Sequence, residues 1–186
     1  MKLFICFLLF LNPSVNFDYK KRILPYSIVI SKADLIVEGS ITSVSKGKYE
    51  LLINQFIKGK STPKIKVEIF EDWMCDRRIE KPKAGQKLIL FLEKENSYYS
   101  IINQSTGELF VSKDNSVRTF MMDKFPKSTV LKKGITMFLD TYTCQGNLND
   151  RFLQNIHFQK KKTSTEIDKM KKENEFFKYL VGEGIQ

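Results

Sequence analysis

The sequence predicts a β-rich α+β fold, in which five to seven strands are followed by two helices that pack on them. Between residues 35 and 120, apolar and polar residues alternate with a period close to two, which is typical of strands with one buried face. After Pro126 the apolar residues recur at helical spacing instead. The chain has 186 residues, enough for one domain with its own core. We assign residues 17–125 to the strands and residues 126–186 to a helical part of the same domain.

The first 16 residues are expected to be a signal peptide. Met1-Lys2 is a short basic start, and Leu3 to Leu11 form an apolar run, much shorter than the roughly 20 residues that span a bilayer. We expect cleavage within residues 14–18 and a secreted or periplasmic protein with no membrane span after removal of the signal. The alternative is a buried N-terminal strand or helix.

A β-hairpin is predicted at the start of the strand region. Residues 35–44 and 49–57 both alternate, and Lys46-Gly47 between them is a turn signal. Residues 64–70 alternate most regularly, with Ile65, Val67 and Ile69 on the inward face.

The strand predicted at residues 87–93, KLILFLE, is apolar on both faces. We therefore expect a central strand that is covered from both sides. Shorter strands are expected at residues 97–102, 108–112 and 117–121, where turn formers separate them.

Two helices are predicted after Pro126. Apolar residues recur at helical spacing over residues 131–142. The second helix begins at the capping box TSTE (163–166) and ends at Gly182. Its apolar stripe is expected to pack on the domain and consists of Ile167, Met170, Phe177 and Leu180.

The segment Glu71 to Arg78, EDWMCDRR, lies in the connection between two predicted strands and contains the only tryptophan of the chain. Trp73, Arg77 and Arg78 are candidate partner-binding residues, because Trp and Arg are enriched in the hot spots of interfaces. The alternative, which we favour, is a structural anchor in which Trp73 covers the end of the strand region.

Cys75 and Cys144 remain after removal of the signal peptide, which carries Cys6. In an oxidising compartment they can form one disulfide. The alternative is two separately buried thiols.

Motifs for catalysis, metals and nucleotides are lacking. The single histidine, His157, has no cysteine within five residues, and the chain contains neither CxxC nor HxxxH. The phosphate-binding GxxxxGK[ST] and the dinucleotide-binding GxGxxG are also missing. We therefore predict no catalytic, cofactor-binding or metal-binding residues, no cofactor and no enzymatic activity.

The formal charge of +10 becomes +9 without residues 1–16, which contain one lysine and no acid. Such a charge attracts polyanions. The lysines are scattered along the chain, however, which favours an ordinary solvated surface over a dedicated polyanion site.

Several segments follow one another in a familiar order: ADLIVEGSITSV (33–44), ELLINQFIKGK (50–60), a cysteine-containing connection, AGQKLILFLEK (84–94) and GELFV (107–111). This order resembles the netrin-like or TIMP-like (tissue inhibitor of metalloproteinases-like) family, especially its bacterial secreted members. The resemblance covers about residues 31–112. It implies a closed or partly open OB-like β-barrel of five to seven antiparallel strands.

The resemblance does not extend to the best-known activity of that family. Its inhibitors chelate the zinc of a protease through an N-terminal cysteine, whereas the mature N-terminus around Asn16 to Asp18 offers none. We expect an exported, non-catalytic binding module for an unknown protein or glycan. One alternative is a basic envelope protein that binds a polyanion or glycan, and a second is an inhibitor of an extracellular hydrolase by another route. Because export removes the chain from nucleic acid, we do not expect a nucleic-acid partner.

Overall fold

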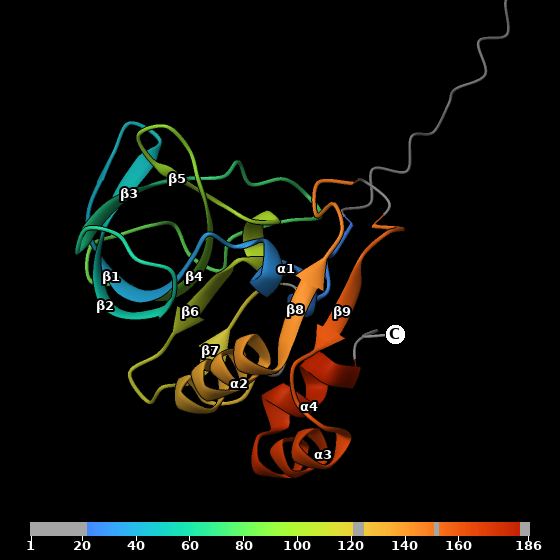
Figure 1. Ribbon diagram of the computed structural model, residues 1–186. Helices are drawn as coiled ribbons and strands as arrows, with labels where there is room; N and C mark the ends of the chain where they lie inside the picture. Colours follow the sequence, from blue (N-terminus) through green and yellow to red (C-terminus); the bar gives the residue numbers. More distant parts are fainter. Residues whose placement is uncertain (1–21, 121–124, 151–152, 183–186) are drawn as a thin grey trace, which may run out of the picture.

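The computed structural model describes residues 22–120, 125–150 and 153–182, so the expected signal peptide and its cleavage region lie outside the described residues. Five strands close into a barrel, two more strands extend its sheet, and the described helices lie against one side (Figure 1). The predicted β-rich α+β fold is confirmed. None of the helices in these described ranges is long and apolar enough to cross a membrane.

The barrel strands follow one another in the order β1-β2-β3-β5-β4, and β4 pairs with β1 to close the ring. Their bounds are β1 (Leu35–Ser45), β2 (Lys48–Lys58), β3 (Lys64–Glu68), β4 (Lys87–Lys94) and β5 (Tyr99–Ile101). The pairing of β3 with β5 is parallel, and the other barrel pairings are antiparallel. A wholly antiparallel barrel was expected. A closed ring with an odd number of strands cannot alternate in direction all the way round, so one parallel pair is required.

The β1–β2 hairpin forms where the sequence predicts it. Lys46 (φ 48°) and Gly47 (φ 74°) make its two-residue turn, and both have the positive φ that matches the twist of a hairpin. Three register shifts interrupt the β1–β2 pairing. Such bulges bend a strand, which helps these long strands to curve around the barrel.

β4 has apolar side chains on both faces, as predicted. Leu88, Leu90 and Leu92 belong to the core inside the barrel, whereas Ile89 and Phe91 belong to a second core under the helices. One edge of β4 pairs with β1, and its other edge pairs with β5 and then with β6 (Glu108–Val111). β7 (Val117–Arg118) continues the sheet from β6, and the short 3-10 helix η1 (Gln104–Thr106) links β5 to β6.

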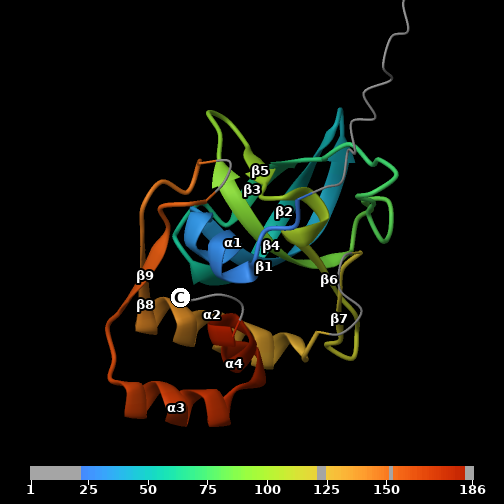
Figure 2. The same cartoon turned by 90° about the vertical axis from the view of Figure 1, so that its right-hand side faces the viewer.

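The helical side brings together the two ends of the described chain. Its elements are α1 (Tyr26–Lys32), α2 (Ser128–Thr141), the hairpin of β8 (Tyr142–Gln145) and β9 (His157–Lys160), α3 (Ser164–Glu173) and α4 (Glu175–Gly182). Figure 2 shows α1 and α2 next to the barrel, α4 beside α2, and α3 farthest from the barrel. The sequence patterns did not predict α1 or the β8–β9 hairpin.

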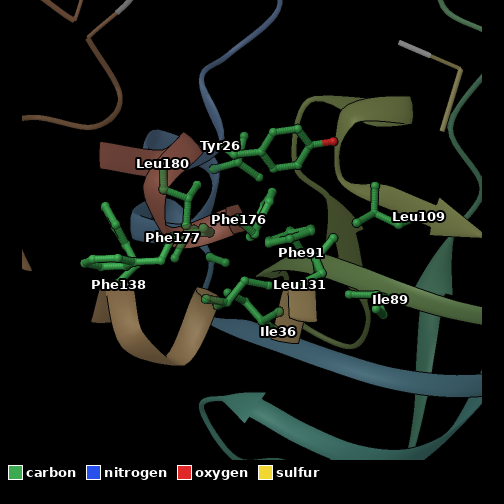
Figure 3. Packing of buried hydrophobic residues seen from close by; sticks show 14 of the residues in the cluster. Tyr26, Ile36, Ile89, Phe91, Leu109, Leu131, Phe138, Phe176, Phe177 and Leu180 are labelled. Atoms are coloured by element: carbon green, nitrogen blue, oxygen red, sulfur yellow. The ribbon is translucent and has the colours of Figure 1, made fainter. Parts of the chain in front are cut away.

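The second core joins these helices to the outside of the barrel (Figure 3). The ring of Tyr26 on α1 lies 5.8 Å from that of Phe91 on β4 and 6.2 Å from that of Phe176 on α4. The predicted apolar stripe of the last helix supplies Ile167, Phe177, Leu180 and, half-buried, Met170.

The last helix is split in two at Asn174, where the sequence predicts one continuous helix. Asn174 has φ −145°, outside the helical range. Its side chain donates to the carbonyl of Val130 on α2 (2.9 Å) and accepts the backbone N–H of Phe177 (2.8 Å). It therefore caps the start of α4 and ties that helix to α2, which explains the break.

A buried carboxylate ties α2 to the barrel. The carboxylate of Glu38 on β1 accepts a hydrogen bond from Lys87 Nζ (2.8 Å) and another from Lys132 Nζ on α2 (2.6 Å). Burial opposes ionisation of Glu38, but the hydrogen bonds from the two lysines outweigh it and lower the pKa of this carboxyl.

Candidate functional site

The segment Glu71–Arg78 forms a tight turn that protrudes from the connection between β3 and β4. Trp73 and Asp76 exchange two backbone hydrogen bonds, of 3.1 and 2.9 Å, which fold the chain back on itself. Met74 and Cys75 occupy the tip, and the side chain of Met74 is 79% exposed. We call residues 73–77 the tip turn.

Arg78 holds the base of the tip turn from inside the barrel. Its Nη2 lies 2.7 Å from Oε1 of Glu108 on β6, and both side chains are only 2% exposed. Nη1 donates to the carbonyl of Phe70 (3.2 Å), and the guanidinium lies 4.0 Å from the centre of the Phe70 ring. The hydroxyl of Tyr49 donates to the same Glu108 oxygen (3.2 Å).

This arrangement corrects the expectation that Arg78 is a partner-binding residue. Glu108 lies on the same face of β6 as Phe110, which belongs to the barrel core. A carboxylate in that position needs a cation, and Arg78 reaches it from the connection above. Arg78 is therefore an internal anchor and does not face solvent.

Burial dominates the protonation behaviour of this network. Burial raises the pKa of Glu108, against the opposing effect of Arg78 and its hydrogen bond. Burial and the Glu108 carboxylate together raise the pKa of Tyr49 well above its ordinary value, so the phenol keeps its proton and donates. Within the described chain, Arg78 Nε and Glu108 Oε2 have no hydrogen-bond partner. A buried pair with unsatisfied atoms adds little to stability over apolar residues, so its main effect is to fix the position of the connection.

Two more contacts hold the tip turn against η1. The carboxylate of Asp76, which is fully buried, accepts the backbone N–H of Ser105 (3.3 Å). The indole N–H of Trp73 donates to Gln104 Oε1 (3.3 Å). Trp73 is half-buried, as an anchor would be, while Arg77 is exposed. The tip turn thus has a fixed base and a free tip.

Met74 is the residue that sequence reasoning missed. It is the most exposed large apolar side chain in the described part of the chain. A methionine gives no sequence signal for exposure, because it is as frequent in cores as any aliphatic residue. Its position between a tryptophan and a cysteine in a loop rich in turn formers was the only available hint.

The two cysteines are both free, so the disulfide that their number allows is not formed in this structure. Cys75 is exposed in the tip turn, whereas Cys144 is half-buried on β8. Figure 2 shows the β8–β9 hairpin and the connection between β3 and β4 on opposite sides of the molecule. Burial raises the pKa of the Cys144 thiol, against the opposing effects of Ser31 and Lys58.

His157 lies exposed on β9, and its Nε2 is 2.7 Å from Oε1 of Gln145 on β8. This neutral amide partner does not activate an imidazole as a carboxylate would. No group of three or more His, Cys, Asp or Glu side chains that could hold a metal ion occurs among the described residues.

In comparisons with known proteins, no family model matches the chain, and no curated protein sequence matches it.

Proposed function

We propose that the protein is an exported, non-catalytic binding module that docks to a partner protein through the tip turn. The observation that carries this proposal is the contrast between the tip and its base. Met74 is 79% exposed, while Arg78, immediately after the turn, is buried against Glu108. Export rests on the N-terminal sequence, and a netrin-like identity rests on the order of strands, with which a closed five-stranded barrel is consistent.

A fixed base favours binding because it lowers the entropy that is lost on association. A loop that is already held in its bound shape loses less freedom when it docks. The backbone bonds of the turn, the contacts to Gln104 and Ser105 and the buried ion pair all restrict residues 73–78 before a partner arrives.

The side chains at the tip suit a protein surface. Met74 offers a flexible, polarisable apolar group that fits an apolar pocket. Arg77, exposed in the same turn, can pair with a carboxylate at the rim of that pocket. An exposed apolar residue and an exposed arginine in one turn suit a protein partner better than a sugar surface, which lacks a deep apolar pocket.

Cross-linked capture from the envelope of the producing organism, followed by affinity measurement with the captured protein, tests this proposal. We expect Met74→Ser and Arg77→Glu each to weaken binding at least about fivefold, as the loss of an anchor residue does. Leu52→Ser is the matched control, because Leu52 is a 45% exposed apolar residue on β2, away from the tip turn. Unchanged affinity in both tip variants, or an equal loss in Leu52→Ser, would contradict the proposal.

A further inference from the structure

A second candidate site lies on the outer face of the β1–β2 hairpin. A depression of about 460 Å³ is lined by Ser43, Ser45, Lys46, Lys48, Glu50 and Lys66, with Tyr49 beneath it. We call it the hairpin pocket. Ser43 pairs with Glu50, and Glu50 with Lys66, so these side chains leave the sheet on the same face. The intervening Tyr49 and Val67 are in the barrel core.

Glu50, the acid that lines the hairpin pocket, already forms an ion pair with Lys64, which lies outside the pocket lining. Glu50 lies 2.7 Å from Lys64 Nζ and accepts a hydrogen bond from the Ser43 hydroxyl (2.9 Å). Within the described ranges, Lys46, Lys48 and Lys66 form no ion pair with any carboxylate. Among the residues that line the depression, three lysines therefore stand against the single acid Glu50, while Glu68 lies opposite Lys48 on β3 and outside the lining.

Lys48 is held in place before any ligand binds. Its Nζ lies 4.4 Å from the centre of the Tyr98 ring, a cation–π contact that restricts a normally mobile side chain. Lys48 and Lys66 are diagonal neighbours across the β2–β3 pairing, in which Lys48 faces Glu68 and Glu50 faces Lys66. Diagonal neighbours lie roughly 7–8 Å apart, with their β-carbons somewhat closer, near enough for two lysines to reach one tetrahedral anion. Lysine is a common partner of phosphate.

The hairpin pocket offers no platform for a nucleic-acid base. Proteins that bind single strands stack the bases on exposed aromatic rings. Tyr49 is 1% exposed, and Lys48 already occupies one face of the Tyr98 ring. The site therefore suits charged groups without bases.

We propose that the hairpin pocket binds a phosphate or sulfate group carried by an anionic polysaccharide. Lys48 and Lys66 contact the anion, Lys46 extends the positive surface along the chain of the ligand, and the Ser45 hydroxyl supplies a further donor. This site shares no residue with the tip turn, so either proposal can fail while the other stands.

Calorimetric titration of the full chain with two defined polymers tests the inference, and the tighter ligand identifies the source of the anion. The polymers are a sulfated polysaccharide and a phosphate-bearing polysaccharide, and single-stranded DNA serves as the competing class. The test variant is Lys48→Gln/Lys66→Gln. The control Lys169→Gln/Lys172→Gln removes the same charge from two exposed lysines of α3, far from the hairpin.

We expect the hairpin variant to bind the better polysaccharide at least about tenfold more weakly, and its salt slope to fall by roughly one for each lysine removed. The control should lose less than about threefold. An equal loss in both variants would show that only net charge matters and would overturn the proposal, as would the absence of polysaccharide binding. Hairpin-dependent binding that is tighter for DNA than for either polysaccharide would overturn it in favour of a nucleic-acid site. Melting curves that match the wild type confirm that both variants are folded.

Discussion

Replacement of Arg78 by methionine should destabilise the fold strongly and in a pH-dependent way. The change removes the cation that lies 2.7 Å from Glu108, the bond to the Phe70 carbonyl and the contact with the Phe70 ring. Among the residues that the structure describes, Glu108 would keep only the hydroxyl of Tyr49 as a partner. Removal of one partner from a buried ion pair costs about 3–5 kcal/mol, a large fraction of the roughly 5–15 kcal/mol that stabilises a typical domain.

The sign of the pH dependence follows from the raised pKa of Glu108. Burial already raises this pKa above 4.5, and loss of the arginine raises it further. Below pH 4.5 the carboxyl is protonated in both the folded and the unfolded chain, so its charge contributes nothing to the loss. As the pH rises through 4.5 toward the folded pKa, the unfolded state is favoured by about 1.4 kcal/mol for each unit between the two values. The loss relative to wild type should therefore be larger at pH 7.5 than at pH 4.

Urea unfolding, followed by far-UV circular dichroism at both pH values, measures this loss directly. Fluorescence of Trp73, the only tryptophan, reports the tip turn in the same samples. The double variant Arg78→Met/Glu108→Leu removes both charges and should recover most of the stability, apart from about 1 kcal/mol for the lost Tyr49 bond. A loss below about 1 kcal/mol at pH 7.5 would refute the reasoning. So would an equal loss at both pH values, or a double variant as unstable as the single one.

Three further predictions concern the rest of the fold. Glu38→Gln should reduce the free energy of unfolding by about 1–3 kcal/mol at pH 7, because two lysine bonds to a buried carboxylate are weakened. Since the pKa of Glu38 is lowered, this difference should be present above pH 4.5 and shrink as the pH falls through the folded pKa, which urea titration at several pH values would show. Gly59→Ala should destabilise by more than Gly47→Ala, although both have positive φ, because only at Gly59 would a Cβ lie 2.3 Å from the Asp34 carbonyl. The positive φ costs an alanine about 1–2 kcal/mol at either position, and the clash at Gly59 adds to that cost. Similar melting temperatures for the two variants would therefore contradict this account. A thiol reagent should modify Cys75 at once and Cys144 only slowly in the native protein, and a thiol count of zero in the exported protein would show a disulfide instead.

Much of the barrel could be predicted because the pattern of apolar and polar residues along a strand shows which of its two faces is buried. Alternation in β3 identified Ile65 and Val67 as inward residues, and the uniformly apolar β4 indicated cover on both sides. No local pattern of residues shows that β5 runs parallel to β3, because this direction follows from closure of the ring. The break at Asn174 likewise depends on its contact with Val130, 44 residues earlier in the chain.

The sequence indicated the segment that forms the candidate site, but not which of its side chains are buried and which are exposed. Its segment stood out by composition, yet Arg77 and Arg78 look alike in a connection that has no period. The position of Glu108 decides which arginine turns inward. A single glutamate at the start of an apolar strand does not indicate an ion pair in the sequence. The lysines of the hairpin pocket also looked scattered, because β2 and β3 bring them together only when they pair.

β4 contributes side chains to both cores of this domain, one core on each of its faces. Leu90 faces the barrel interior and Phe91 faces the helices, so loss of either core removes the packing on one face of the same strand. The barrel and the helical part should therefore lose structure in one cooperative event, without a stable half-folded form. In hydrogen exchange, the amides at the centre of β4, bonded on both edges, should be the last to exchange, and only when the whole chain opens.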